Sequence, residues 1–215
     1  LDTCGLVHRR LAVIDVAQGK QPMQAARNGI TATIVYNGEI YNCPELRHQL
    51  QQEGAVFQTT CDTEVVLQAY LHWGKACVQK LNGIFAFAIW EAETKRLFLA
   101  RDRIGVKPLF YAEVPDGLVF ASELKALLLH PQVPHEIDAT GIAELLLMGP
   151  GRTPGCGVFR TVRELKPAQC GWYQDGSISI ECYWSLQAKP HTETFPQTAE
   201  HVRYLVKDAI TCLLY

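Results

Sequence analysis

One unbroken apolar segment, residues 84–90, constrains the fold of this chain more than any other feature. Its sequence, IFAFAIW, contains no polar side chain. A strand with one face in solvent alternates apolar and polar residues, so this segment is predicted to be a strand buried on both faces. A chain of 215 residues is long enough to build such a core without disulfide staples.

Strand and helix patterns follow one another in groups along the chain. Further strands are predicted at residues 10–16, 31–36, 55–59, 96–100, 109–113, 118–122, 171–174 and 177–184. Helices are predicted at residues 42–54, 62–73, 75–81, 123–129 and 139–148, and from residue 198 onward. Hairpins join most of the strands, so we expect an α+β fold of mostly antiparallel sheets with helices packed outside them.

Composition excludes several classes of function. The 20 Lys and Arg residues against 22 Asp and Glu give a net charge of −2, which offers no basic surface for nucleic acid. The apolar runs are too short for a membrane span, and the first residues do not form a signal peptide. The eight cysteines include no C-x-x-C pair, and no glycine-rich phosphate loop follows a strand. We therefore predict a cytoplasmic protein with reduced thiols and no metal site.

The segment Tyr36-Asn37-Gly38-Glu39 has two interpretations. The Asn37 carboxamide and the Gly38 N–H could converge on one oxygen, as the donors of an oxyanion hole do. Taken alone, an Asn-Gly dipeptide favours a hairpin turn. Residue types and spacing leave both interpretations open.

Three charged positions are equally ambiguous when taken one by one. Arg9 and Arg10 begin a predicted strand and point to opposite faces, so one could hold a carboxylate or both could decorate a sheet edge. Asp62 could cap a helix or face a ligand ammonium group. Residues 101–108 could form a salt-bridged corner or a recognition loop.

Taken together, these segments resemble, in order, the glutaminase domain of glutamine-hydrolysing asparagine synthetases. The motifs are HRRLAVIDVAQGKQPM from His8, YNGEIYN from Tyr36, CDTEVVL from Cys61, LNGIFAFAIW from Leu81, ARDRIGVKPLFY from Ala100, FASELKALL from Phe120 and RTPGCGVFRTVRELKPAQ from Arg152. The resemblance extends over essentially the whole chain. It implies an αββα sandwich of the N-terminal-nucleophile hydrolase type.

The resemblance also implies a set of glutamine-binding residues. Asn37 and Gly38 correspond to the oxyanion hole, and Glu39 and Asp62 to the carboxylates that bind the glutamine α-ammonium group. The other end of the glutamine would be held by Arg10, through the α-carboxylate, and by the backbone of Val13 and Ile14. The family nucleophile, an N-terminal cysteine, is expected upstream of this chain. Cys4 lies too close to Arg10 in sequence to replace it, so we expect the chain alone to be inactive.

The same resemblance predicts the domain organisation. Residues 1–184 would form the amidotransferase domain, and residues 185–215 a linker and the first helix leading to a synthetase domain outside the chain. ATP and Mg²⁺ are expected only in that linked domain, and homodimerisation, frequent in the family, is an open prediction. The alternative is a domain that has lost its nucleophile and serves as a scaffold or ligand-binding module.

Overall fold

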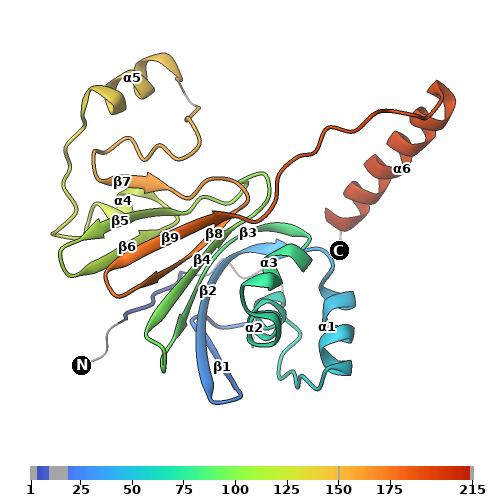
Figure 1. The fold of residues 1–215 in the computed structure, drawn as a ribbon, viewed down its shortest axis with the longest axis horizontal. Helices are drawn as coiled ribbons and strands as arrows, with labels where there is room; N and C mark the ends of the chain where they lie inside the picture. The colour runs from blue at the N-terminus through green and yellow to red at the C-terminus, as the bar shows by residue number, and fades with distance from the viewer. Residues whose placement is uncertain (1–3, 10–18, 150, 214–215) are drawn as a thin grey trace. The chain divides into compact units, whose positions relative to one another are not determined.

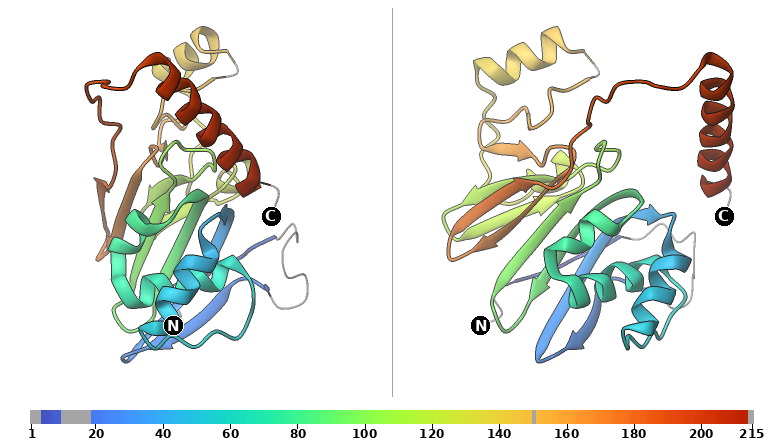
Figure 2. Two further views of the ribbon diagram at one scale, coloured as in Figure 1. Left: turned by 90° about the vertical axis from the view of Figure 1, so that its right-hand side faces the viewer. Right: turned by 45° about the vertical axis from the view of Figure 1, so that its right-hand side comes forward.

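A computed structural model describes residues 4–9, 19–149 and 151–213 of the chain. Its internal contacts divide it into two units, Leu1–Trp184 and Ser185–Tyr215, which are described separately. Figures 1 and 2 show the elements of both units. The described part of the chain holds no helix with the length and hydropathy of a membrane span.

A six-stranded antiparallel sheet forms the centre of the first unit (Figure 1). In spatial order its strands are β1 (Met23–Arg27), β2 (Ile30–Ile40), β3 (Gly83–Glu91), β4 (Arg96–Arg101), β8 (Gln169–Gln174) and β9 (Ser177–Cys182). The apolar segment 84–90 lies in β3, between β2 and β4. Phe87 packs toward the helices, whereas Ala86 and Ala88 pack on the opposite face. Both faces of β3 are therefore buried, as predicted.

A second sheet contains three described antiparallel strands, in the order β6 (Gly117–Ala121), β5 (Phe110–Val114) and β7 (Val162–Glu164). Its inner face packs on the six-stranded sheet, where Tyr111 joins Val35 and Leu99 in one core. Its outer face packs on α4 (Leu124–Leu127) through Phe110 and Leu127. A longer excursion between β6 and β7 carries α5 (Ala139–Leu147).

The helices between β2 and β3 cover the outer face of the six-stranded sheet (Figure 2). They are α1 (Cys43–Gln52), α2 (Asp62–Trp73), the 3₁₀ turn Gly74–Ala76 and α3 (Cys77–Lys80). Leu50 of α1 and Val66 of α2 pack there against the sheet. The layers therefore run helix, sheet, sheet, helix, and the predicted αββα architecture is confirmed.

Some local predictions were wrong because longer-range pairing overrides local preference. Residues 55–59 form no strand, and β1 and β7 were not predicted. Asn42, the first residue of the helix predicted at residues 42–54, precedes α1, and its side chain binds the Lys80 carbonyl and the Asn82 N–H rather than the first turn of the helix. The predicted strand at residues 10–16 lies entirely outside the described residues.

The second unit contains α6 (Phe195–Leu213). It is longer toward its N-terminus than the helix predicted from residue 198. Apolar residues on this helix, including Val202, Leu205 and Val206, are about half exposed.

Candidate functional site

The hydrogen-bond partners on the β1 side of β2 change from backbone to side chain after Ile34. β1 pairs with β2 only as far as the partners Met23 and Ile34. Two residues further along β2, the Gln21 side chain forms the hydrogen bonds to the backbone of Tyr36. Its Oε1 accepts a hydrogen bond from the Tyr36 N–H at 2.6 Å, and its Nε2 donates one to the Tyr36 carbonyl at 3.0 Å. A side-chain amide thus occupies the place of a strand peptide group.

Asn37, Gly38 and Glu39 lie inside β2 rather than in a turn. They pair with Ala86, Phe85 and Ile84 of β3, respectively. The hairpin interpretation of Asn37-Gly38 is therefore wrong, because nine consecutive residue pairs with β3 outweigh the turn preference of the dipeptide. All three residues remain partly exposed.

Strand geometry determines which way the Gly38 peptide faces. Alternate residues of an antiparallel strand direct their N–H and C=O groups to the same side. The Gly38 N–H therefore points in the same direction as the Tyr36 N–H, away from β3. Phe85, which pairs with Gly38, gives the same result. Its N–H and its carbonyl both bond to Asp102, so they point away from β2 and leave the Gly38 peptide group without a partner on β3. The Gly38 N–H thus faces the β2 edge beyond Gln21.

The side chains alternate between the two faces of β2. Tyr36 belongs to the core beneath the helices, whereas Val35 belongs to the core between the sheets. Asn37 therefore lies on the intersheet face, as does Glu39. The Asn37 side chain and the Gly38 N–H come from consecutive residues of β2, so both groups are available to the predicted oxyanion hole.

Gly38 has a structural reason to be glycine in addition to any catalytic one. A Cβ atom at this position would lie 2.3 Å from the Ile84 carbonyl oxygen and 2.8 Å from the Phe85 Cα. Both atoms are backbone atoms of β3 and cannot move aside without disturbing the sheet. The close approach of the two strands therefore requires a residue without a side chain.

Asp62 is the first residue of α2 and lies beside β2. Its Oδ2 accepts a hydrogen bond from the Tyr36 hydroxyl at 2.7 Å. Burial raises the pKa of Asp62, although hydrogen bonding by Tyr36 and by the N–H groups of Thr63 and Ile40 acts in the opposite direction. Within the described ranges Asp62 forms no salt bridge. A partly buried carboxylate without a cation favours the arrival of an ammonium group.

Of the remaining predicted glutamine ligands, Glu39 lies within the described residues, and its charge acts on Tyr36. Burial, followed by the nearby Asp62, raises the pKa of the Tyr36 hydroxyl well above its usual range, and the charge of Glu39 adds to this effect. The two predicted ammonium-binding carboxylates therefore both act on Tyr36. Arg10, Val13 and Ile14 lie outside the described residues, so their roles stay predictions.

Glu64, on the first turn of α2, has a structural role that the sequence pattern did not reveal. It is 5% exposed and accepts hydrogen bonds from the N–H groups of Gln58 at 2.8 Å and Thr59 at 2.7 Å. These bonds hold the loop where a strand was predicted. The sequence signal that could have revealed this role is the acidic side chain of Glu64 in the first turn of the helix, two residues after Asp62.

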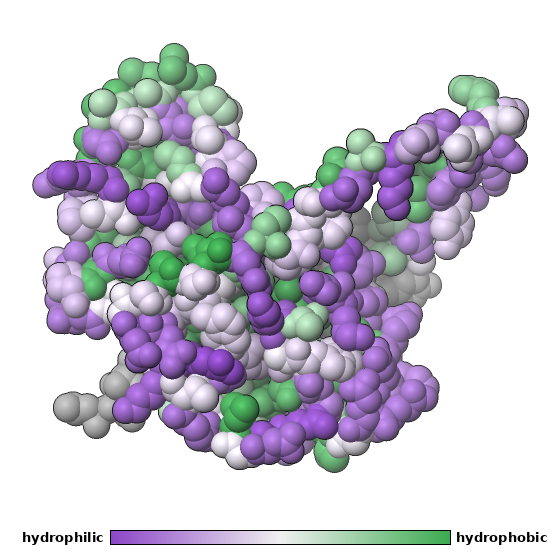
Figure 3. Space-filling view, in the orientation of Figure 1, coloured by the Kyte–Doolittle hydropathy of each residue, from purple (hydrophilic) through white to green (hydrophobic). Residues whose placement is uncertain are grey.

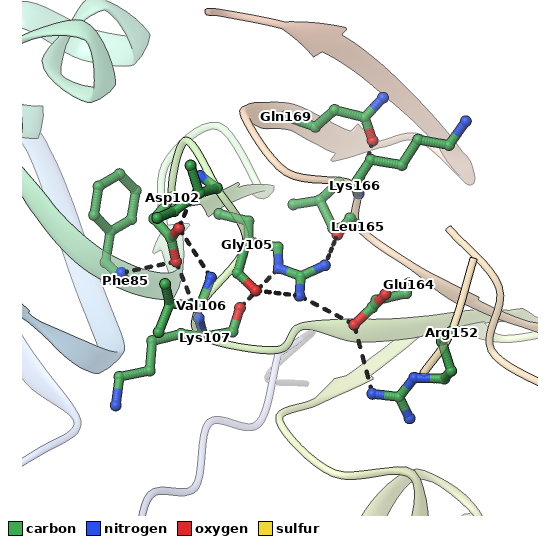
Figure 4. Close-up of polar contacts among 12 residues, drawn as sticks. Phe85, Asp102, Gly105, Val106, Lys107, Arg152, Glu164, Leu165, Lys166 and Gln169 are labelled. Atoms are coloured by element: carbon green, nitrogen blue, oxygen red, sulfur yellow. Dashed lines mark hydrogen bonds and ion pairs between the residues drawn. The ribbon is translucent and has the colours of Figure 1, made fainter. Parts of the chain in front are cut away.

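Residues 101–108 form the salt-bridged corner rather than a recognition loop (Figure 4). Asp102 is fully buried and accepts hydrogen bonds from four backbone N–H groups, those of Phe85, Ile104, Val106 and Lys107. Arg101 is also buried and pairs with Glu164 at 3.1 Å. Because Phe85 lies opposite Gly38, this corner braces β3 beside the candidate oxyanion hole.

A cavity of about 560 Å³ opens elsewhere, between β1 and α2. Its lining includes Met23 and Gln68 but none of Asn37, Gly38, Glu39 and Asp62. The candidate site is therefore defined by the strand edge and not by this cavity.

Two antiparallel sheets between helices are the fold of the N-terminal-nucleophile amidotransferases. A solved structure with this fold is glutamine phosphoribosylpyrophosphate amidotransferase from B. subtilis, complexed with ADP and GMP. It matches with a TM-score of 0.54 and 24% identity over 76% of this chain and 32% of that chain. The family model described as "Glutamine amidotransferase domain" matches residues 2–184, and the chain belongs to this family.

Curated relatives agree with the resemblance seen in the sequence. The chain is 45% identical over 204 residues to asparagine synthetase [glutamine-hydrolyzing] 3 of Bacillus subtilis (strain 168), which is 95% of this chain and 33% of that protein. It is 35% identical over 207 residues to asparagine synthetase [glutamine-hydrolyzing] 1 of the same organism, 96% of this chain and 32% of that protein. The chain therefore spans about a third of the length of these relatives. Its likeness to asparagine synthetase glutaminase domains is confirmed.

Proposed function

We propose that the longer protein containing this chain hydrolyses the side-chain amide of glutamine and passes the ammonia to a linked synthetase domain. That domain would use ATP and Mg²⁺ to make asparagine from aspartate. The relatives' names support the overall reaction. The observation that carries the glutaminase assignment is the position of Asn37 and Gly38 in β2, directly after Tyr36, whose hydroxyl bonds to Asp62.

The chemistry assigned to these residues follows from the charges that form during hydrolysis. A cysteine thiolate from outside this chain would attack the amide carbon, and the carbonyl oxygen would become an oxyanion stabilised by the Asn37 amide and the Gly38 N–H. The C–N bond then breaks, the nitrogen takes a proton and leaves as ammonia, and water cleaves the thioester to glutamate. Glu39 and Asp62 would bind the α-ammonium group.

The α-carboxylate of glutamine would bind Arg10. A guanidinium group can hold a carboxylate through two parallel hydrogen bonds. The backbone groups of Val13 and Ile14 would complete that end of the site.

Cys4 is a poor candidate for the nucleophile. Burial raises the pKa of its thiol to about 11, whereas a nucleophilic cysteine needs a lowered pKa to form the thiolate. We therefore expect the 215-residue chain alone to release no ammonia from glutamine. Ammonia release that Cys4→Ala abolishes would contradict this assignment.

The apolar helix α5 supports a linked partner domain. Leu145, Leu146 and Leu147 are 50%, 78% and 82% exposed, and Figure 3 shows hydrophobic side chains gathered over this helix. Gly141 anchors the helix where a Cβ would meet the Val158 carbonyl. A cluster of exposed large apolar side chains of this kind marks an interaction surface. Because the relatives are about three times as long as the chain, we propose that the rest of the longer protein covers α5.

Charge substitution on α5 tests this contact. In the full-length protein, Leu146→Glu should leave glutamine hydrolysis intact but raise the number of glutamate molecules formed per asparagine. Val56→Glu, at an exposed apolar residue on a loop, is the matched control and should leave that ratio unchanged. An unchanged ratio in Leu146→Glu, or a change of oligomeric state without uncoupling, would instead favour a second copy of the chain as the partner of α5.

The alternative is a scaffold or ligand-binding domain that has lost its nucleophile. Asn37→Ala in the full-length protein distinguishes the two. Glutamine-dependent asparagine formation should fall about 10²- to 10³-fold, the usual effect of losing one oxyanion donor, while ammonia-dependent formation persists. A wild-type protein that uses only ammonia would support the scaffold.

A further inference from the structure

We propose that Gln21 is a positioning residue for glutamine hydrolysis, an inference that rests on the function proposed above. Its carboxamide sets the place of the Tyr36 peptide and thereby of Asn37 and Gly38, which follow directly. It also ties this strand to the helix that carries Asp62. No local pattern in the sequence assigns a role to Gln21.

The need for a side chain at this point follows from where β1 ends. The described backbone pairing between β1 and β2 stops at Met23 and Ile34, so β1 supplies no paired peptide group to Tyr36, two residues further along β2. There the Gln21 carboxamide uses its oxygen as an acceptor and one of its two N–H groups as a donor, as a peptide group would, in its two hydrogen bonds to Tyr36.

The same carboxamide also reaches α2. Gln21 Nε2 lies 3.3 Å from Thr63 Oγ1, to which it donates a hydrogen bond. Thr63 is buried and directly follows Asp62 in sequence. The Tyr36 hydroxyl completes this hydrogen-bond network by donating to Asp62 at 2.7 Å. Gln21, Tyr36, Asp62 and Thr63 therefore link β2 to the N-terminus of α2 through side-chain hydrogen bonds.

Along the β2 edge, the Gly38 N–H lies between two restrained peptide groups. The Tyr36 N–H is held by Gln21, and the Ile40 N–H acts on the carboxylate of Asp62. Without Gln21, the Tyr36 end of this edge loses both of its side-chain hydrogen bonds. A shift there moves the Gly38 N–H relative to the developing oxyanion. Oxyanion donors act chiefly in the transition state, so kcat should fall more than KM rises.

The experiment compares two glutamines of the same hairpin in the full-length protein. Gln21→Ala removes the network, whereas Gln24→Ala removes only an exposed hydrogen bond, at 3.2 Å, to Thr33. We expect Gln21→Ala to lower the glutaminase kcat about tenfold or more, less than the ~10²–10³-fold loss of an oxyanion donor. Glutamine KM and ammonia-dependent asparagine formation should stay near wild type, and Gln24→Ala should change neither activity.

Two outcomes overturn the inference. One is an unchanged glutaminase kcat in Gln21→Ala, and the other is an equal loss of the ammonia-dependent activity, which would indicate general destabilisation. If Gln21→Ala does not fold, Gln21→Met decides, because it keeps the side-chain length and removes the donor and the acceptor. A wild-type protein without glutaminase activity refutes the proposed function itself, whereas an active protein indifferent to Gln21 refutes only the positioning role.

Discussion

Replacing Asp62 with asparagine separates the charge of this residue from its hydrogen-bonding geometry. The carboxamide oxygen of the Asp62→Asn variant could still accept the Tyr36 hydroxyl bond, which is 2.7 Å long with the carboxylate, but the negative charge is lost. Removing one partner of a buried charge pair costs about 2–5 kcal/mol. Asp62 is only partly buried, so we expect about 2–3 kcal/mol, or a roughly 30- to 150-fold rise in the glutamine KM.

The stability of Asp62→Asn should change much less than its glutamine binding. Burial raises the folded-state pKa of Asp62. Such a group contributes stability below its unfolded pKa, and this contribution is lost as pH rises through the folded pKa. At pH 7 the charge therefore opposes folding, and the Asp62→Asn substitution removes that opposition. The Tyr36 bond to a neutral acceptor is weaker by about 1 kcal/mol, so the two effects offset each other.

Glu64→Gln provides the matched control for this substitution. Glu64 lies two residues further along the same helix turn, is buried, and accepts N–H bonds from Gln58 and Thr59. We expect it to lower the free energy of unfolding by about 1–3 kcal/mol without raising the glutamine KM. Urea unfolding, glutamate formation and ammonia-dependent asparagine formation, all measured on the full-length protein, give the three readouts.

The expected contrast is that Asp62→Asn raises the glutamine KM, whereas Glu64→Gln lowers the free energy of unfolding, and its absence would refute the reasoning. If Asp62→Asn destabilises the protein as much as Glu64→Gln does, and the glutamine KM stays near the wild-type value, then Asp62 stabilises the start of α2 and does not bind the ammonium group. The Tyr36 hydrogen bond would then serve packing alone.

Two further substitutions test the β2 edge. Tyr36→Phe removes a hydroxyl that lowers the pKa of Asp62, so that pKa should rise and the acid limb of kcat/KM for glutamine should move to higher pH; an unmoved limb would contradict the role of Asp62. Gly38→Ala places a Cβ 2.3 Å from the Ile84 carbonyl oxygen. Such overpacking costs about 1–3 kcal/mol, so the melting temperature should fall, and a wild-type value in thermal unfolding would argue against the close approach.

Much of the fold could be predicted because burial leaves a local signature. The segment 84–90 is apolar at every position, and only a strand with both faces covered requires that. The helix at residues 62–73 could be predicted from its apolar stripe. The helix predicted at residues 139–148 is confirmed as α5, and in the structure Asp138 caps it by accepting the Gly141 N–H. β1 and β7 escaped prediction because short strands are fixed by their partners and not by their own residues.

The candidate site was predicted only in part. Asn37 and Gly38 were singled out through family resemblance, while their local preference pointed to a turn. Gln21 and Tyr36 lie within two of the resembling motifs, but neither could be given a role, because their partners lie 15 and 26 residues away in the sequence. Hydrogen bonds of this kind depend on which strand ends lie together, which no local pattern encodes.

The sequence by itself determined the layered α+β class, the family and the identity of the polar residues from which a glutamine site can be built. Burial patterns and motif order suffice for these, since both are written in consecutive residues. Tertiary structure alone decided that residues 101–108 are a structural corner, that Asn37-Gly38 continues a strand, and that one glutamine side chain replaces a strand peptide. Each depends on backbone groups from distant segments that must find hydrogen-bond partners once they leave water.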